Sequence, residues 1–175
     1  MITSVFVGTS LDGFIARHDG TYDFLSAGEG VPHGYDEFIA TVDVLVIGRK
    51  TFETILGFSD WPYGKRQVVV LSSRPLDLGK FRGERVEQMS GAPAEIYSEL
   101  SHRGFKHAYV DGGVTVQGFL RAGLITRLTI TRVPMLIGDG IPLFGSLPHD
   151  VRLRHLETQT YAGALVQSKY EVLKD

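Results

Sequence analysis

Short apolar runs alternate along the chain with segments in which apolar residues recur at helical spacing. A strand that is buried on both faces of a sheet is nearly all apolar, so the runs are predicted to be central strands. These runs are residues 2–9, 42–47, 67–71 and 108–110, and residues 84–87 are a predicted edge strand. The predicted helices are residues 34–41 and 93–103 and the segments that begin after Gly48 and after Gly113. Strands and helices that alternate in this way predict a parallel sheet covered by helices.

The C-terminal part has a different pattern, because its strands follow one another without helices. Residues 124–133 alternate apolar residues with Thr and Arg, as a sheet strand does. Residues 152–160 and 164–172 flank the turn at 161–163, which predicts an antiparallel hairpin. We therefore predict one domain over residues 1–175, an α/β protein with a three-layer α/β/α fold. Its mainly parallel central sheet carries the hairpin at its C-terminal edge.

Three loops follow neither pattern. Residues 10–16 place Phe14 and Ile15 side by side in a loop, so this segment either packs on the core or forms the wall of a pocket. Residues 17–33 are rich in Gly, Asp and Ser and are predicted to run over the surface. Residues 138–144 form a predicted turn with an apolar tail.

Composition and charge narrow the possible functions. A formal net charge of -2 at pH 7 argues against nucleic acid or an anionic membrane as the main partner, because such partners need a concentrated basic surface. The absence of cysteine excludes disulfides and cysteine metal sites, and it suits the cytoplasm. No run is long enough to span a membrane, and the N-terminus has no signal-peptide pattern. The histidines lack metal-ligand spacing, and His102 and His107 are predicted surface residues. We expect a cytoplasmic protein that acts on a small molecule without a bound metal.

Three strand ends are followed by turns that suit phosphate groups. The turns are Gly48-Arg49-Lys50-Thr51, Ser72-Ser73-Arg74 and Asp111-Gly112-Gly113-Val114-Thr115. Two of them open predicted helices, whose first N–H groups lack intrahelical partners, and glycine lets a phosphate approach the backbone. Plainer interpretations exist for each turn, such as a tight turn at the glycine pair or solvated side chains at Arg49 and Lys50. Because parallel strands present their carboxyl ends at one edge, the three turns together predict a site for a ligand with several phosphates, such as a dinucleotide with a phosphorylated ribose.

Five short segments of the chain occur in an order that is found in a known superfamily. They are residues 10–16, residues 48–53, residues 71–75, residues 110–113 and residues 138–144. They resemble the dihydrofolate reductase-like superfamily, and most closely its branch with the C-terminal reductase domain of the riboflavin-biosynthesis deaminase-reductase. Neither a G-x-G-x-x-G fingerprint nor a P-loop occurs in a suitable context. The resemblance implies an NADPH-dependent oxidoreductase similar to 5-amino-6-(5-phosphoribosylamino)uracil reductase.

The resemblance also implies which residues hold NADPH. The implied contacts are Ile15 and Ala16 with the nicotinamide, Gly48, Arg49, Lys50 and Thr51 with the adenosine phosphates, Ser72, Ser73 and Arg74 with the adenosine ribose and its 2′-phosphate, and Gly112, Gly113, Val114 and Thr115 with the pyrophosphate and adjoining ribose. A 2′-phosphate contact favours NADPH over NADH. The apolar wall at Ile15 would exclude water beside the hydride.

The resemblance does not extend to a catalytic residue. Dihydrofolate reductases use a buried carboxylate on the helix after the first long loop, and neither Asp36 nor Glu37 falls at the matching place. We assign no catalytic residue, and Asp36 is the one candidate for that role, against the alternative of a solvated helix face. Asp12 and Asp36 stay candidates for contact with the substrate, against the alternatives of a turn residue and a solvated helix face. The deaminase partner of the riboflavin reductase needs zinc-binding cysteines, which this chain lacks.

The sequence therefore supports three functions. The first is an NADPH-dependent reductase that transfers hydride to a small heterocyclic or imine-like molecule. Dihydrofolate reductase is the alternative enzyme, and a nucleotide-binding module without turnover is the alternative from another class. A homodimer is implied by the resemblance alone.

Overall fold

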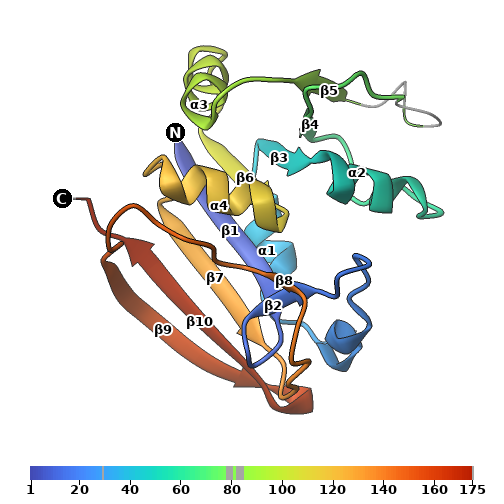
Figure 1. The fold of residues 1–175 in the computed structure, drawn as a ribbon, viewed down its shortest axis with the longest axis vertical. Coiled ribbons are helices and arrows are strands. Elements are labelled where there is room, and N and C mark those ends of the chain that lie inside the picture. Colours follow the sequence, from blue (N-terminus) through green and yellow to red (C-terminus); the bar gives the residue numbers. More distant parts are fainter. Residues whose placement is uncertain (29, 78–80, 82–84, 175) are drawn as a thin grey trace.

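The computed structural model describes residues 1–28, 30–77, 81 and 85–174, and a large twisted sheet runs through its centre (Figure 1). In these residues eight strands form the sheet in the order β5-β4-β3-β6-β1-β7-β10-β9. The strands are β1 (Ile2–Thr9), β3 (Val44–Gly48), β4 (Gln67–Leu71), β5 (Val86–Met89), β6 (His107–Asp111), β7 (Arg127–Arg132), β9 (Leu153–Tyr161) and β10 (Leu165–Val172). Neighbours from β5 to β7 are parallel, whereas β10 is antiparallel to both β7 and β9. The predicted mainly parallel sheet with an antiparallel C-terminal hairpin is confirmed.

Helices cover both faces of the sheet, because successive side chains of a strand point to opposite faces. The helices are α1 (Tyr35–Ala40), α2 (Arg49–Leu56), α3 (Pro93–His102) and α4 (Gly113–Arg121). In β3, Val44 and Val46 pack in one core with residues of α3 and α4. Leu45 and Ile47 pack in a second core with residues of α1 and α2. This burial on both faces gives the three predicted layers. Within the described residues, no helix combines the length and apolar character that crossing a membrane requires.

The predicted ends of the strands agree best with those in the structure where an apolar run is flanked by turn residues. β1 and β4 begin and end as predicted. The predicted edge strand at 84–87 is found as β5, two residues later, and residue 84 lies outside the described residues. The prediction for residues 124–133 included the turn that precedes β7.

The segment 17–33 differs from its prediction as a surface loop. It contains the 3-10 helix η1 (Asp23–Gly28), in which the Phe24 side chain is only 2% exposed. Phe24 packs with Val133 and Leu165 in a third apolar cluster. Burial of a phenylalanine side chain contributes about 2 kcal/mol, so Phe24 is one of the contacts that hold this polar segment against the sheet. Most of the segment is exposed or half-buried, as a surface loop should be, but its apolar residues lack any periodic pattern, so the sequence did not show that Phe24 anchors it.

His107 was also predicted at the surface, and the structure buries it at the start of β6. Its Nε2 lies 2.7 Å from Ser4 Oγ, and its Nδ1 lies 3.1 Å from Thr41 Oγ1. Burial lowers the pKa of His107 below its ordinary value of 6.5, against the opposing effect of the Thr41 carbonyl. The folded protein therefore favours the neutral ring.

The free energy of unfolding should fall as the pH is lowered through 6.5, because there the unfolded chain binds a proton at His107 that the folded chain does not yet bind. The expected slope from this residue is up to about 1.4 kcal/mol per pH unit. His107→Gln should flatten the slope in urea unfolding measured between about pH 7.5 and 5. His102→Gln is the matched control, since His102 is exposed at the end of α3. An unchanged slope in His107→Gln would contradict the assignment.

Candidate functional site

The three turns that were predicted to suit phosphate groups follow strands whose carboxyl ends lie at one edge of the sheet, as the sequence predicted. In the register of β3 with β4, Gly48 is opposite Leu71, which precedes the serine turn. In the register of β3 with β6, Ile47 is opposite Asp111, which precedes the glycine pair. The carboxyl ends of β4, β3 and β6 are therefore consecutive along this edge, and residues far apart in the sequence meet there.

The first turns of α2 and α4 are in direct contact. A Cβ atom on Gly112 would lie 2.6 Å from Thr51 Oγ1, and a Cβ on Gly48 would lie 2.9 Å from Thr115 Oγ1. Gly112 also has a φ of 91°, in the left-handed region that favours glycine. Neither helix has a side-chain cap at its N-terminus. The first N–H groups of both helices therefore lack a side-chain cap, and two positive helix ends lie beside each other at this edge.

Arg49 has protein partners in this structure. Its guanidinium donates to Ser72 Oγ at 3.0 and 2.7 Å and to the Pro75 carbonyl at 2.8 Å. The Ser72 hydroxyl in turn donates to the Arg74 carbonyl. Arg49 therefore ties the serine turn to the start of α2, which explains a cation at a helix N-terminus. Its predicted contact with a phosphate stays a prediction.

Lys50 and Arg74 are the other cations at this edge, and both are exposed. Within the described residues, neither side chain makes a hydrogen bond or an ion pair, in contrast to Arg49. Ser73 lies beside Arg74 and is also solvent-accessible. These side chains are placed where a phosphorylated ligand could reach them.

The apolar loop predicted to form a wall packs on the start of α4. Its strand β2 (Phe14–Ala16) pairs with β8 (Ile141–Pro142). A Cβ atom on Gly113 would lie 2.9 Å from Ile15 Cδ1, so Ile15 closes over this glycine. Ala16 is buried, whereas Val114 is 77% exposed. The loop thus lies beside the glycine turn rather than in open solvent.

The two carboxylates predicted to contact a substrate have different surroundings, and their contact with a substrate stays a prediction. Asp12 accepts hydrogen bonds from the backbone N–H groups of Gly138 at 2.8 Å and Ile137 at 3.1 Å. The Ser10 hydroxyl and these N–H groups hold the pKa of Asp12 below its ordinary value. Asp12 therefore orients the loop against the 138–144 turn. Asp36 is exposed in the first turn of α1 and is brought to neither the turns nor the cavity described next.

Asp111 ends β6 directly before the glycine pair. Its carboxylate accepts the Gly112 N–H at 2.8 Å. Burial raises the pKa of Asp111 above its ordinary value, and the hydrogen bond from Gly112 only partly opposes that effect, although some of the residue stays accessible to solvent. A desolvated carboxylate thus lies at the edge where the turns meet. Within the described residues, no group of three or more potential ligands is arranged to hold a metal ion.

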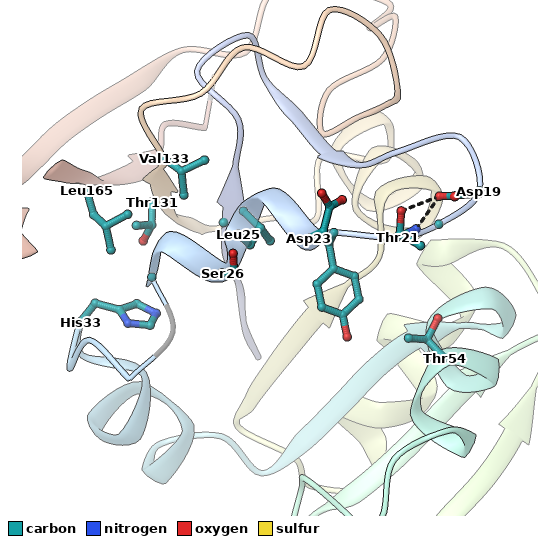
Figure 2. Close-up of a pocket in the computed structure, with 14 residues that line it drawn as sticks. Asp19, Thr21, Asp23, Leu25, Ser26, His33, Thr54, Thr131, Val133 and Leu165 are labelled. Atoms are coloured by element: carbon teal, nitrogen blue, oxygen red, sulfur yellow. Dashed lines mark hydrogen bonds between the residues drawn. The ribbon is translucent and has the colours of Figure 1, made fainter. Parts of the chain in front are cut away.

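A cavity of about 800 Å³ lies on the face of the sheet that α1 and α2 cover. Segment 19–26 forms one wall, and the opposite walls include Gly8 of β1, Thr54 of α2 and Thr131 of β7. Gly8 and Thr131 are near the carboxyl ends of β1 and β7, which are parallel to β6, so the cavity opens at the same edge of the sheet. Figure 2 shows His33 and Thr131 toward one end of the cavity and Asp19 and Thr54 toward the other.

The sequence did not identify this cavity, because most of its lining comes from the segment interpreted as a surface loop. The one available signal was Phe24-Leu25, an apolar pair within a polar stretch. A Cβ on Gly8 would lie 3.0 Å from Leu25 Cδ2, which shows how closely this segment approaches β1.

Comparison with known proteins agrees with this architecture. The family described as RibD C-terminal domain matches residues 3–166. A structure of a putative riboflavin biosynthesis protein from Shewanella sp. PV-4 has a TM-score of 0.92 at 36% identity, covering 99% of this chain and 100% of that chain. The dihydrofolate reductase HdrB of Haloferax volcanii is 32% identical over 126 residues, which are 69% of this chain and 62% of HdrB.

A more distant likeness concerns the fold alone. Dihydrofolate reductase from Enterococcus faecalis, solved in complex with NADP(H), has a TM-score of 0.68 at 19% identity, covering 99% of this chain and 97% of that chain. The match over residues 3–166 and this shared architecture lead to one conclusion. The chain belongs to the RibD C-terminal domain family and has a dihydrofolate reductase-like fold.

Proposed function

We propose that the protein is an NADPH-dependent reductase of a small heterocyclic or imine-like substrate. The observation that carries this proposal is the contact between two uncapped helix N-termini beside an 800 Å³ cavity. Such N-termini bind phosphate through unpaired N–H groups and the helix dipole. Membership in a family with reductase relatives supports the same conclusion.

The residues at the edge fit a dinucleotide with a phosphorylated ribose. Gly112, Gly113, Val114 and Thr115 would hold the pyrophosphate, because they form the first turn of α4. Ser73 and Arg74 would bind the 2′-phosphate, since a guanidinium offers paired donors to phosphate oxygens. Gly48, Lys50 and Thr51 would contact the remaining phosphates, and Arg49 would hold the serine turn in place through Ser72.

The nicotinamide would lie between Ile15 and Ala16 and the cavity. NADPH, when bound, supplies a hydride that can reduce a C=N bond, with a proton from solvent completing the product amine. The apolar β2 segment would keep water from this face of the site. The cavity walls would orient the substrate, which is the main contribution that positioning makes to such a transfer.

Two alternatives keep specific support. A dihydrofolate reductase activity is suggested by the similarity to HdrB. A nucleotide-binding module without turnover fits the absence of an assigned proton donor. We also predict a cytoplasmic protein that forms a homodimer and binds neither nucleic acid nor membranes.

One experiment separates these functions. Calorimetric titration with NADPH measures cofactor binding, and absorbance of NADPH measures its oxidation with dihydrofolate or with a ribosylaminopyrimidine. Binding together with oxidation by the ribosylaminopyrimidine or another heterocycle supports the first proposal, and oxidation by dihydrofolate alone supports the second. Binding without oxidation by any candidate favours the module, and a failure to bind NADPH contradicts all three.

Gly112→Ala should lower the affinity for NADPH at least about tenfold, because the added Cβ would displace Thr51 and separate the two helix N-termini. Gly123→Ala is a matched control at the other end of α4. Gly123 also has a positive φ, of 66°, but a Cβ there meets nothing within 4 Å. The control should lose about 1 kcal/mol of stability from its left-handed backbone and keep its affinity. Equal loss of affinity in both variants would contradict the role of the Gly112 turn.

Arg74→Ala should weaken NADPH binding about ten- to a hundredfold and leave NADH binding nearly unchanged, because only NADPH carries the 2′-phosphate. Arg121→Ala, at the exposed end of α4, controls for a general loss of positive charge. Titration of each variant with both cofactors gives the comparison. Equal losses for NADPH and NADH in Arg74→Ala would refute the assignment.

A further inference from the structure

Asp19 and Asp23 carry the negative charge at the cavity, and no lysine or arginine occurs among the described residues that line it. Both aspartates are exposed, so they lie where the cavity opens to solvent. Asp19 is held by the N–H of Thr21 at 2.9 Å and the hydroxyl of Thr21 at 2.7 Å (Figure 2). Asp23 accepts two hydrogen bonds from Arg17, at 2.6 and 3.0 Å.

These contacts leave a net negative charge at the opening. Arg17 compensates one carboxylate, and its Nε and one terminal nitrogen are already engaged by Asp23. Hydrogen bonds from Thr21 keep the pKa of Asp19 below its ordinary value, and those from Arg17 do the same for Asp23. Both carboxylates are therefore ionised at neutral pH, and an incoming anion meets one uncompensated charge.

The remaining polar groups of the cavity are the ring of His33 and hydroxyls, among them those of Tyr22 and Thr131, which can donate or accept hydrogen bonds. His33 Nδ1 lies 2.6 Å from the Val31 carbonyl, so Nδ1 carries the hydrogen and Nε2 is an acceptor in the neutral ring. The Thr54 hydroxyl donates to the Lys50 carbonyl, which leaves its lone pairs. Ser26 adds a hydroxyl that can donate or accept. These groups can accept N–H groups of a ligand, and the negative charge of Asp19 and Asp23 beside them disfavours a ligand with several anionic oxygens.

The cations of the candidate site lie at the turns of the sheet edge and outside the lining of the cavity. Arg49 and Arg74 belong to the turns at the sheet edge, and Lys50 lies one helical turn before Thr54, toward the Gly48 turn. The cavity lining contains none of the three. Positive charge thus faces the proposed cofactor phosphates, and negative charge faces the proposed substrate.

Building on the proposed reductase function, we infer that the cavity accepts an uncharged or cationic nitrogen heterocycle whose N–H groups face Asp19, Asp23 and His33. A phosphate or carboxylate on the substrate opposes binding. The protein therefore reduces a dephosphorylated, unconjugated heterocycle and discriminates against phosphoribosyl compounds. This assignment separates it from a 5-amino-6-(5-phosphoribosylamino)uracil reductase.

The test compares two pairs of probes that differ only in charged groups. One pair is a ribosylaminopyrimidine with and without its 5′-phosphate, and the other is dihydrofolate and its diamide, in which both glutamate carboxylates are neutral. Calorimetry with NADP+ present measures binding of each. The uncharged member of each pair should bind at least about tenfold more tightly. Equal or tighter binding of the charged members, or no binding by either uncharged probe, would overturn the inference.

The proposed reductase function and the charge preference of the cavity are tested by separate measurements, so one can fail while the other stands. NADPH titration alone tests the cofactor site, and the probe pairs can be measured without any cofactor. Loss of NADPH binding with an intact preference for the uncharged probes would contradict the reductase and leave the charge assignment of the cavity standing.

Ser26→Lys provides the complementary test, because Ser26 is exposed in η1 and lines the cavity. The added ammonium should reduce the preference for the uncharged ribosylaminopyrimidine about tenfold or reverse it. Ser26→Gln, which is similar in length but uncharged, should keep the preference, and Asp19→Asn should reduce it. Thermal unfolding of each variant verifies that it is folded. An unchanged preference in both Ser26→Lys and Asp19→Asn would refute the electrostatic basis of the inference.

Discussion

The site depends on one contact, in which the first turns of α2 and α4 meet at the carboxyl edge of the sheet. Thr51 and Thr115 occupy the spaces that side chains at Gly112 and Gly48 would need. Each N-terminus carries roughly half a positive charge, and neither first turn contains an acidic residue. Bringing the two together is therefore unfavourable until an anion lies between them. The contact exists because β3 and β6 are neighbours in the sheet, so the strand order determines the binding site.

The position of Asp111 at this edge is also determined by the sheet, through the alternation of side chains along β6. In β6, Val110 faces the core of α4 and Tyr109 faces the core of α2, so alternation directs Asp111 toward the α2 side. Its carboxylate therefore does not cap α4, and burial raises its pKa. Burial and the Asp111 charge together raise the pKa of Tyr35 to about 12. Because the folded pKa of Asp111 is raised, ionisation of this residue reduces stability as the pH rises above about 3.8. The edge thus combines two helix N-termini whose first turns lack acidic residues with one desolvated carboxylate, which is hydrogen-bonded to the N–H of Gly112.

The sequence predicted the fold where the local apolar pattern and the sheet topology agree. It did not predict the cavity that is proposed to hold the substrate. Central strands show a continuous apolar run, and parallel strands place their carboxyl ends together, so the meeting of the three turns followed from the sequence. The partners of other residues lie far along the chain. Phe24 is buried by Val133 and Leu165, and His107 is buried beside Ser4. Arg49 looked free for a ligand because its partner, Ser72, lies 23 residues later in another turn. Such contacts exist only once the sheet has formed.

The division of the site between these two kinds of segment explains why a family match constrains the cofactor more than the substrate. The edge proposed to bind phosphate is made by turns that the strand order brings together, so it depends on the sheet itself. The cavity is made by segment 19–26, which is attached to the sheet chiefly through Phe24 and Leu25 and can vary its polar residues without disturbing either core. Charge in this segment is therefore free to differ between relatives that share the fold. In this chain the segment carries aspartates, whereas the edge carries arginines and a lysine. This separation of charge is the property that should decide which substrates the cavity accepts.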